Sequence, residues 1–123
     1  GNLKRVSLEL GGKSPNIVFA DADLDEAASG AASAIYFNHG QCCCAGSRLF
    51  IEHKAYDKIM PKLIEYSDRI KVGPGMAADT EMGPLVSSEQ YERVTGYLAA
   101  GKQEGARVAA GGARRFLARW SAP

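Results

Sequence analysis

The sequence predicts an α/β fold with an open, mostly parallel β-sheet and flanking helices. Segments that alternate apolar and polar residues, as strands do, are interleaved with segments whose apolar residues recur at helical spacing. This order is typical of parallel strands joined by crossover helices. The strands are few for a sheet that is normally covered on both faces, so we expect these 123 residues to belong to something larger.

The N-terminal part is expected to form two strands and a helix. Residues 4–10 alternate apolar and polar side chains, and residues 16–20 form the short apolar run of a buried strand. Asp23, with Glu26 three residues later, has the form of a helix N-terminal capping box. The alanine-rich stripe that follows predicts a closely packed helix, which Asn-His-Gly at residues 38–40 ends.

A strand and a second helix are expected next. Residues 48–52 read as a strand, and residues 54–70 carry an apolar stripe at helical spacing. Pro61 falls inside that stripe, where it either kinks the helix or marks its true start. Residues 73–86 contain the glycines and prolines of a loop.

The last elements are a third helix and a short strand. Ser87 with Gln90 has the form of a second capping box, and the helix that it begins fades near Gly101 or Gly105. Residues 107–110 are predicted to form a final short strand.

Charge and composition exclude several kinds of partner. Fifteen Lys and Arg residues against fourteen Asp and Glu leave a formal net charge of +1, which predicts no surface for nucleic acid or for an anionic membrane. No apolar run approaches the roughly 20 residues that cross a bilayer. The N-terminal residues also lack the apolar core of a secretory signal.

All three cysteines of the chain are consecutive, as Cys42, Cys43 and Cys44. Adjacent residues are badly placed for disulfide geometry, and an odd thiol would remain. Zinc sites normally use spaced pairs with further ligands, and His39 and His53 are not at ligand spacing, so we expect no metal site. Cys42 and Cys44 are interpreted as small, buried apolar residues. Unpaired thiols indicate a reducing, cytoplasmic compartment.

Two stretches carry the signals for function. Residues 8–15 read Leu-Glu-Leu-Gly-Gly-Lys-Ser-Pro, and residues 37–48 read Phe-Asn-His-Gly-Gln-Cys-Cys-Cys-Ala-Gly-Ser-Arg. They resemble the two active-site signatures of the NAD(P)-dependent aldehyde dehydrogenases, in the same order. The resemblance implies that residues 1–112 are part of the catalytic, thiol-bearing domain of that family, whereas residues 113–123 form a divergent C-terminal tail.

The resemblance implies a chemical role for one residue in each stretch. It assigns the nucleophile to Cys43 and the general base to Glu9. In the implied mechanism the Cys43 thiolate attacks the aldehyde carbon, and loss of hydride to NAD or NADP leaves a thioester. Water deprotonated by Glu9 then hydrolyses the thioester to a carboxylic acid. Without their motifs, Cys43 would read as an inert buried thiol and Glu9 as the polar face of a strand.

Four further residues are expected near the cofactor. The resemblance places Leu10 and Gly11 beside the nicotinamide end, and Gln90 and Arg93 near a cofactor ribose. For Gln90, a structural role in the capping box is an equally good explanation.

The resemblance also implies an aldehyde substrate and a homo-oligomer. It further implies a dinucleotide-binding domain that these residues do not contain, so we expect the chain alone not to oxidise aldehydes. The sequence leaves open which aldehyde is used and whether the cofactor is NAD or NADP. Two other hypotheses remain: a cofactor-independent thiol esterase, and a non-catalytic fragment stabilised by packing against other subunits.

Overall fold

The structure is a computed structural model that describes residues 1–113. All of the predicted C-terminal tail except Ala113 lies outside the described residues. The elements, in chain order, are β1 (Pro15–Val18), α1 (Leu24–Tyr36), the 3-10 helix η1 (Phe37–Gly40), β2 (Arg48–Ile51), α2 (His53–Arg69) and α3 (Ser88–Gln103).

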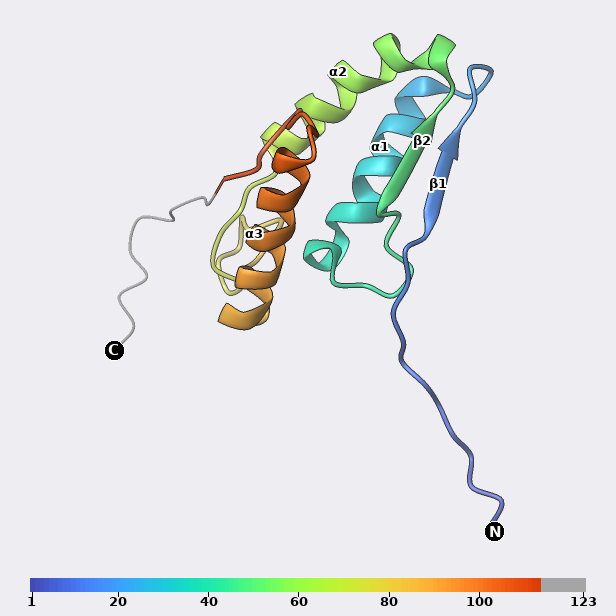
Figure 1. Cartoon of the computed structure of the whole chain (residues 1–123), viewed down its shortest axis with the longest axis vertical. Helices are drawn as coiled ribbons and strands as arrows, with labels where there is room; N and C mark the ends of the chain where they lie inside the picture. The colour runs from blue at the N-terminus through green and yellow to red at the C-terminus, as the bar shows by residue number, and fades with distance from the viewer. Residues whose placement is uncertain (114–123) are drawn as a thin grey trace.

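The centre of the fold is a β1–α1–β2 unit (Figure 1). The two strands pair in parallel, from Pro15 opposite Arg48 to Val18 opposite Ile51. A parallel pair requires a crossover connection, and α1 provides it. Within residues 1–113 the sheet has these two strands, and the predicted α/β fold with a parallel sheet is confirmed.

The core lies where α1 packs against the sheet and α2. Val18 from β1, Ala28 from α1 and Ile59 from α2 form one buried cluster. Ala31 and Ala32 are also buried in α1, so small side chains let this helix lie close to its neighbours, as the alanine stripe predicts. Partly buried apolar residues surround the cluster: Leu24, Ala27, Leu49 and Ile51.

Both predicted helix caps are present. The Asp23 carboxylate accepts hydrogen bonds from the backbone N–H groups of Asp25, at 3.0 Å, and Glu26, at 3.2 Å. The Ser87 hydroxyl accepts from the backbone N–H of Gln90 at 3.2 Å. Each cap satisfies donors that the first helical turn leaves without partners, so the starts of α1 and α3 follow from local sequence.

The position of Pro61 resolves an alternative that the sequence leaves open. Helix α2 begins at His53, so Pro61 lies inside the helix and does not mark its start. Lys62, the next residue, forms an ion pair with Asp25 and thereby links α2 to the first turn of α1. None of the helices among the described residues combines the length and the apolar character needed to cross a bilayer.

The predictions of strands at residues 4–10 and 107–110 are wrong. Residues 4–10 have no regular structure, and the side chains of their alternating apolar face, such as Leu8 at 70% exposure, are in solvent. Residues 107–110 do not form a strand either. In both cases no neighbouring strand within residues 1–113 offers the ladder of hydrogen bonds that a strand needs. A short parallel bridge joins Val72, just before the predicted loop, to Met82 inside it.

Candidate active site

The parallel strands bring the two marked stretches to the same edge of the sheet. Residues 8–14 lead into the first residue of β1, and residues 37–47 lead into the first residue of β2. Because those first residues face each other in register, the preceding segments must run side by side. The backbone N–H of Arg48 donates to the Ser14 carbonyl at 3.3 Å, and Arg48 Nε donates to the Lys13 carbonyl at 2.8 Å.

Gly12 lies close to the backbone of the cysteine turn. A Cβ placed on Gly12 would overlap the backbone carbonyl oxygen of Cys43. Only a residue without a side chain allows this contact, which is one of the structural uses of glycine. Sequence reasoning missed this role, although the Gly-Gly pair directly after Glu9 and Leu10 is the signal that could have suggested it.

The cysteines lie in a tight turn just past η1. The backbone N–H of Ala45 donates to the Cys42 carbonyl at 3.1 Å and closes the turn. The next residue anchors it, because the N–H of Gly46 donates to the carbonyl of Ala34 in α1 at 3.0 Å. Ala45 is itself buried, so the turn is attached to the folded part of the molecule.

A strained segment precedes the turn. Asn38 and His39 both have left-handed backbone conformations, with φ of 48° and 62°. The Asn38 side chain donates to the carbonyl of Gln41 at 2.9 Å, and the Gln41 side chain accepts from the backbone N–H of Val86 at 3.3 Å. The buried Nδ1 of His39 has no hydrogen-bond partner among the described residues, a feature that sequence reasoning did not anticipate.

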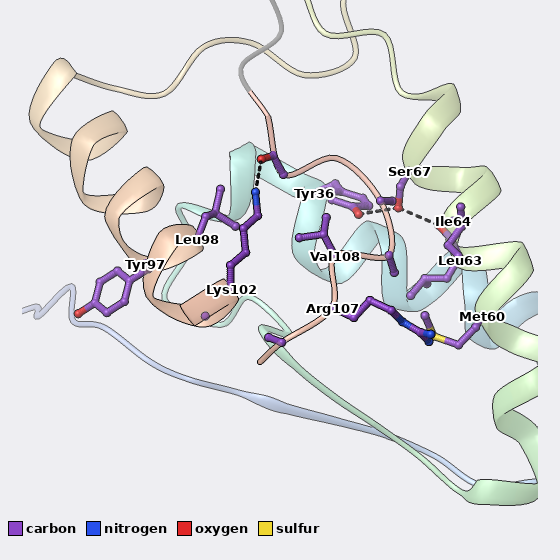
Figure 2. Close-up of a pocket in the computed structure, with 15 residues that line it drawn as sticks. Tyr36, Met60, Leu63, Ile64, Ser67, Tyr97, Leu98, Lys102, Arg107 and Val108 are labelled. Carbon is purple, nitrogen blue, oxygen red and sulfur yellow. Dashed lines mark hydrogen bonds between the residues drawn. The ribbon is translucent and has the colours of Figure 1, made fainter. Parts of the chain in front are cut away.

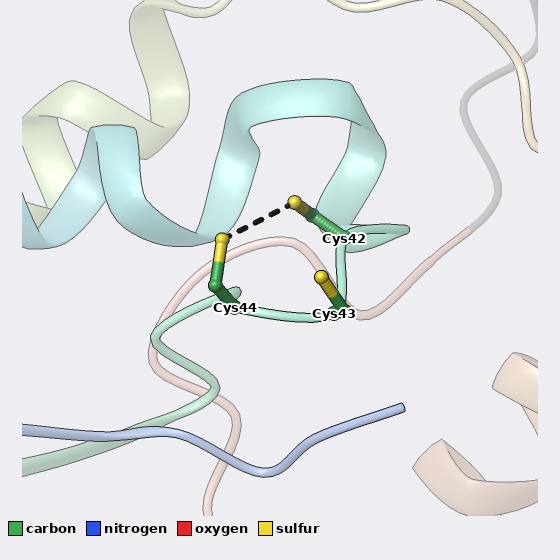
Figure 3. A group of neighbouring side chains, drawn as sticks. All are labelled: Cys42, Cys43 and Cys44. Carbon is green, nitrogen blue, oxygen red and sulfur yellow. Dashed lines mark hydrogen bonds between the residues drawn. The ribbon is translucent and has the colours of Figure 1, made fainter. Parts of the chain in front are cut away.

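The three thiols converge (Figure 3). Their Sγ atoms all lie within 4.8 Å of one another, and the Sγ atoms of Cys42 and Cys44 are 3.5 Å apart and hydrogen bonded. All three thiols are free. Cys43 and Cys44 are exposed and Cys42 is half-buried, so the interpretation of Cys42 and Cys44 as buried residues is wrong. The turn lies at the open edge of the sheet, where the described residues do not cover it.

Hydrogen bonding makes the two outer thiols unequal. The pKa of the Cys42 thiol lies below its ordinary value. The main cause is a hydrogen bond from the Cys44 backbone, and the second is a hydrogen bond from the Cys44 thiol. The hydrogen bond with Cys42 and then the negative charges of Cys42 and Cys43 raise the pKa of the Cys44 thiol. Of these two thiols, Cys42 therefore loses its proton at the lower pH.

Cys43 is chemically accessible. Its side chain is exposed, whereas its backbone N–H hydrogen bonds to the Cys42 thiol and contributes to the lowered pKa of that thiol. A backbone N–H next to a thiol can also donate to an oxyanion that forms on a carbon bonded to that thiol.

Glu9 lies in the extended segment before β1, which leads away from the rest of the molecule (Figure 1). Its carboxylate is exposed and makes no hydrogen bond or ion pair within residues 1–113. The structure thus brings the backbone of the Glu9 stretch against Cys43, while the carboxylate itself contacts neither cysteine nor cation.

The residues expected near the cofactor lie on two separate segments. Leu10 and Gly11 are exposed in the segment before β1, and a side chain at Gly11 would meet no atom within 4 Å. Gln90 is half-buried and Arg93 exposed, both in the first two turns of α3. Neither side chain hydrogen bonds to the described residues, so the amide and the guanidinium are both available to a polar ligand.

A cavity of about 370 Å³ lies elsewhere, between α2, α3 and the segment after α3 (Figure 2). The Tyr36 hydroxyl and the Ser67 hydroxyl hydrogen bond at 2.6 Å on one wall, and Lys102 donates to the carbonyl of Gly112 at 3.5 Å on another. Val108 lines this space, so the segment predicted to be a strand instead packs toward the helices. None of the six predicted site residues lines the cavity.

Comparisons with known proteins match the whole described chain. The sequence profile of the aldehyde dehydrogenase family matches residues 1–119. An aldehyde dehydrogenase from Alternaria alternata is 54% identical over 114 residues, which are 93% of this chain and 23% of that protein. The mitochondrial aldehyde dehydrogenase of Homo sapiens is 49% identical over 111 residues, covering 90% of this chain and 22% of its own length.

Solved structures give the same result. An aldehyde dehydrogenase from Bacillus cereus in complex with NAD+ superposes with a TM-score of 0.87 at 54% identity, covering 94% of this chain and 23% of that one. A betaine aldehyde dehydrogenase from Staphylococcus aureus in complex with NAD+ has a TM-score of 0.86 at 44% identity, with coverages of 94% and 23%. The chain therefore spans less than a quarter of the length of these relatives.

Proposed function

This chain belongs to the aldehyde dehydrogenase family, and from that premise we propose that it carries the nucleophile and the general base of an enzyme that oxidises an aldehyde to a carboxylic acid. The observation that supports this proposal most directly is the contact between the two marked stretches, where Gly12 lies against the carbonyl of Cys43. That contact supports the proposal because Gly12 belongs to the segment that carries Glu9 and Cys43 belongs to the turn.

Cys43 is the proposed nucleophile. Its exposed Sγ attacks the aldehyde carbon and forms a carbon–sulfur bond, giving a thiohemiacetal. The backbone N–H of Cys43, which hydrogen bonds to the Cys42 thiol in the structure, donates instead to the oxyanion that develops on the former carbonyl oxygen. After oxidation the product is held as a thioester, from which sulfur leaves readily.

Glu9 is the proposed general base. Its carboxylate is exposed and unpaired, so it is available to accept a proton from water. The resulting hydroxide attacks the thioester carbon, the carbon–sulfur bond breaks, and the carboxylic acid departs. For this step the segment that carries Glu9 has to turn toward Cys43, and Gly11, where an added Cβ would meet no atom within 4 Å, is the residue where the backbone bends most freely.

We propose NAD or NADP as the cofactor, by analogy with the relatives solved in complex with NAD+. When bound, it supplies an acceptor for the hydride. The backbone at Leu10 and Gly11 and the unpaired side chains of Gln90 and Arg93 are the groups of this chain proposed to bind it. The Gln90 side chain is free for this role because the cap at Ser87 uses only the Gln90 backbone N–H.

We further propose that the chain alone does not catalyse the full reaction, because it spans so small a share of its relatives. An aldehyde is the proposed substrate, and the proposed setting is a cytoplasmic homo-oligomer with no nucleic-acid or membrane partner. The domain boundary at residue 112 is likewise a proposal.

A chimera tests the catalytic roles. Residues 3–112 of this chain replace the matching segment of the Bacillus cereus enzyme, and NADH formation is measured with an aldehyde that the parent enzyme oxidises. Cys43→Ser should abolish NADH formation at all times. Glu9→Gln should leave an initial burst of NADH and slow later turnover by about 100-fold or more, because the thioester forms but is hydrolysed slowly. Glu104→Gln, an exposed carboxylate at the end of α3, is the matched control.

Several outcomes would contradict the proposal. Activity that survives Cys43→Ser would show that Cys43 is not the nucleophile. Loss of the NADH burst in Glu9→Gln would show that Glu9 acts before hydrolysis. With the isolated chain, steady NADH production would overturn its proposed inactivity. Hydrolysis of p-nitrophenyl acetate without any cofactor, lost in Cys43→Ala, would support the thiol esterase hypothesis instead.

A further inference from the structure

We propose that Cys42, Cys43 and Cys44 together form a binding site for one soft metal cation of the Zn²⁺ or Cd²⁺ type. The binding itself does not depend on the proposed catalytic function, because it requires only three thiols held close together. Thiolates are soft ligands, and they select Zn²⁺ and related ions over Mg²⁺ or Ca²⁺.

The distances fit such an ion. A tetrahedral Zn²⁺ with Zn–S bonds of about 2.3 Å holds its sulfur ligands about 3.8 Å apart. The three Sγ atoms here already lie within 4.8 Å of one another, and the Cys42–Cys44 pair is at 3.5 Å. Each pair of Sγ atoms is therefore at most about 1 Å farther apart than in such a site.

The turn explains how consecutive residues converge. Spacing along the chain argues against a metal site, because side chains of adjacent residues normally diverge. Here the hydrogen bond from Ala45 to Cys42 closes a turn around the two exposed cysteines, and the anchor from Gly46 to Ala34 holds that turn on α1. The ligands are therefore arranged before the ion arrives, which lowers the entropic cost of binding.

The site has an open fourth position. Among the described residues the ligand group consists of the three cysteines alone, with no histidine or carboxylate close enough to join it. Structural zinc sites are closed by four protein ligands, whereas a site with three leaves room for water. We therefore expect reversible binding. Because the ion uses the Cys43 sulfur, occupancy would also block the nucleophile, a consequence that rests on the proposed function.

Cadmium titration of the full 123-residue chain tests the site. Under anaerobic, reducing conditions, Cd²⁺ should produce an ultraviolet thiolate-to-metal charge-transfer band that saturates at one ion per chain, with the same stoichiometry by native mass spectrometry. Cys42→Ser and Cys44→Ser should each weaken binding by about tenfold or more, and the double variant should lose it. His53→Ala, which removes an exposed ligand group on α2, should change nothing.

A second measurement separates loss of the site from loss of the fold. Bound Cd²⁺ should protect all three thiols of the unmodified chain from iodoacetamide, while far-ultraviolet circular dichroism confirms that the serine variants stay folded. Binding that persists in Cys42→Ser/Cys44→Ser, protection of fewer than three thiols, or one ion shared by two chains would overturn the proposal. No activity is measured, so failure of the catalytic proposal would leave this result untouched.

Discussion

The carbonyl oxygen of Cys43 fixes the identity of Gly12. Any Cβ at this position would overlap that oxygen, so the backbone of one stretch or the other would have to move. The thiol of the proposed nucleophile is attached to the backbone that would be displaced. Glycine is thus required here by close approach, since Gly12 does not have a positive φ.

Gly12→Ala should therefore impair the chemistry without altering any reactive group. In the chimera we expect kcat/KM to fall by about 100-fold, because a displacement of about 1 Å in a reacting group costs that much. The matched control is Gly30→Ala in α1, where an added Cβ would meet no atom within 4 Å. Equal activity of the two variants would show that the contact does not position Cys43.

The unequal thiols lead to a second prediction at this scale. Alkylation by iodoacetamide follows the thiolate, so a lowered pKa makes a thiol react at lower pH. As pH rises from about 5 to 9, Cys42 should be modified before Cys44, because hydrogen bonds from Cys44 lower the pKa of Cys42 and the Cys42 charge raises that of Cys44. Mass spectrometry of peptides resolves each cysteine. Simultaneous modification of both would contradict the prediction.

Functional residues of the site could be predicted from the sequence only where they belong to one of the two motifs. Cys43 and Glu9 were assigned from the two marked stretches, and their roles remain proposals. The contact at Gly12 and the convergence of the thiols depend on how two distant segments meet, which no local pattern encodes. The unpaired Nδ1 of His39 belongs to the same class of feature, because it depends on what surrounds the residue.

At the scale of elements, prediction succeeded where the determinants are local. Asp23 and Ser87 cap their helices as expected, because a cap is decided within about four residues. Residues 4–10 and 107–110 were wrongly predicted as strands, since alternation shows only that a segment could pair, and pairing needs a neighbour. The sequence left open whether Pro61 lies within the second helix or marks its start, and the structure places it within α2.

The ion pair between Lys62 and Asp25 gives a pH-dependent contribution to the packing of α1 on α2. The hydrogen bond with Asp25, and then its charge, raise the pKa of Lys62 above its usual value of 10.5. A raised pKa in the folded state means that the stabilisation is fully present below the unfolded-state pKa and is lost as pH rises through the folded-state pKa.

Lys62→Gln should therefore lower the melting temperature slightly at pH 7, by an amount typical of exposed ion pairs, and the difference from the unmodified chain should shrink above about pH 10.5. Thermal melts followed by circular dichroism over that range measure this difference. Lys58→Gln on the same helix, where the lysine forms no ion pair with a described residue, is the control. A difference that stays constant with pH would rule out the ion pair as its source.

For the molecule as a whole, the buried core is small. Among residues 1–113 the buried apolar side chains are mostly alanines, and the larger ones are Val18 and Ile59. Large apolar side chains meanwhile remain exposed along the sheet and the segment before it, including Leu8, Ile17 and Phe19 at 70%, 59% and 62%. Exposed large apolar side chains on the sheet and the segment next to it favour an interface, in agreement with a chain that spans less than a quarter of its relatives.

The isolated chain should therefore self-associate through its exposed sheet. We expect the weight-average mass from sedimentation equilibrium to rise with protein concentration, and we expect strong binding of the dye ANS. The double variant Leu8→Ser/Ile17→Ser should reduce both effects, because it replaces two exposed apolar side chains beside the strand pair. Met76→Ser removes a side chain that is 98% exposed in the loop between α2 and α3, so it tests whether any apolar deletion has the same effect. If both variants reduce self-association and ANS binding equally, the sheet is not the surface through which the chain associates. If only the double variant reduces them, the sheet is the surface that a larger assembly covers.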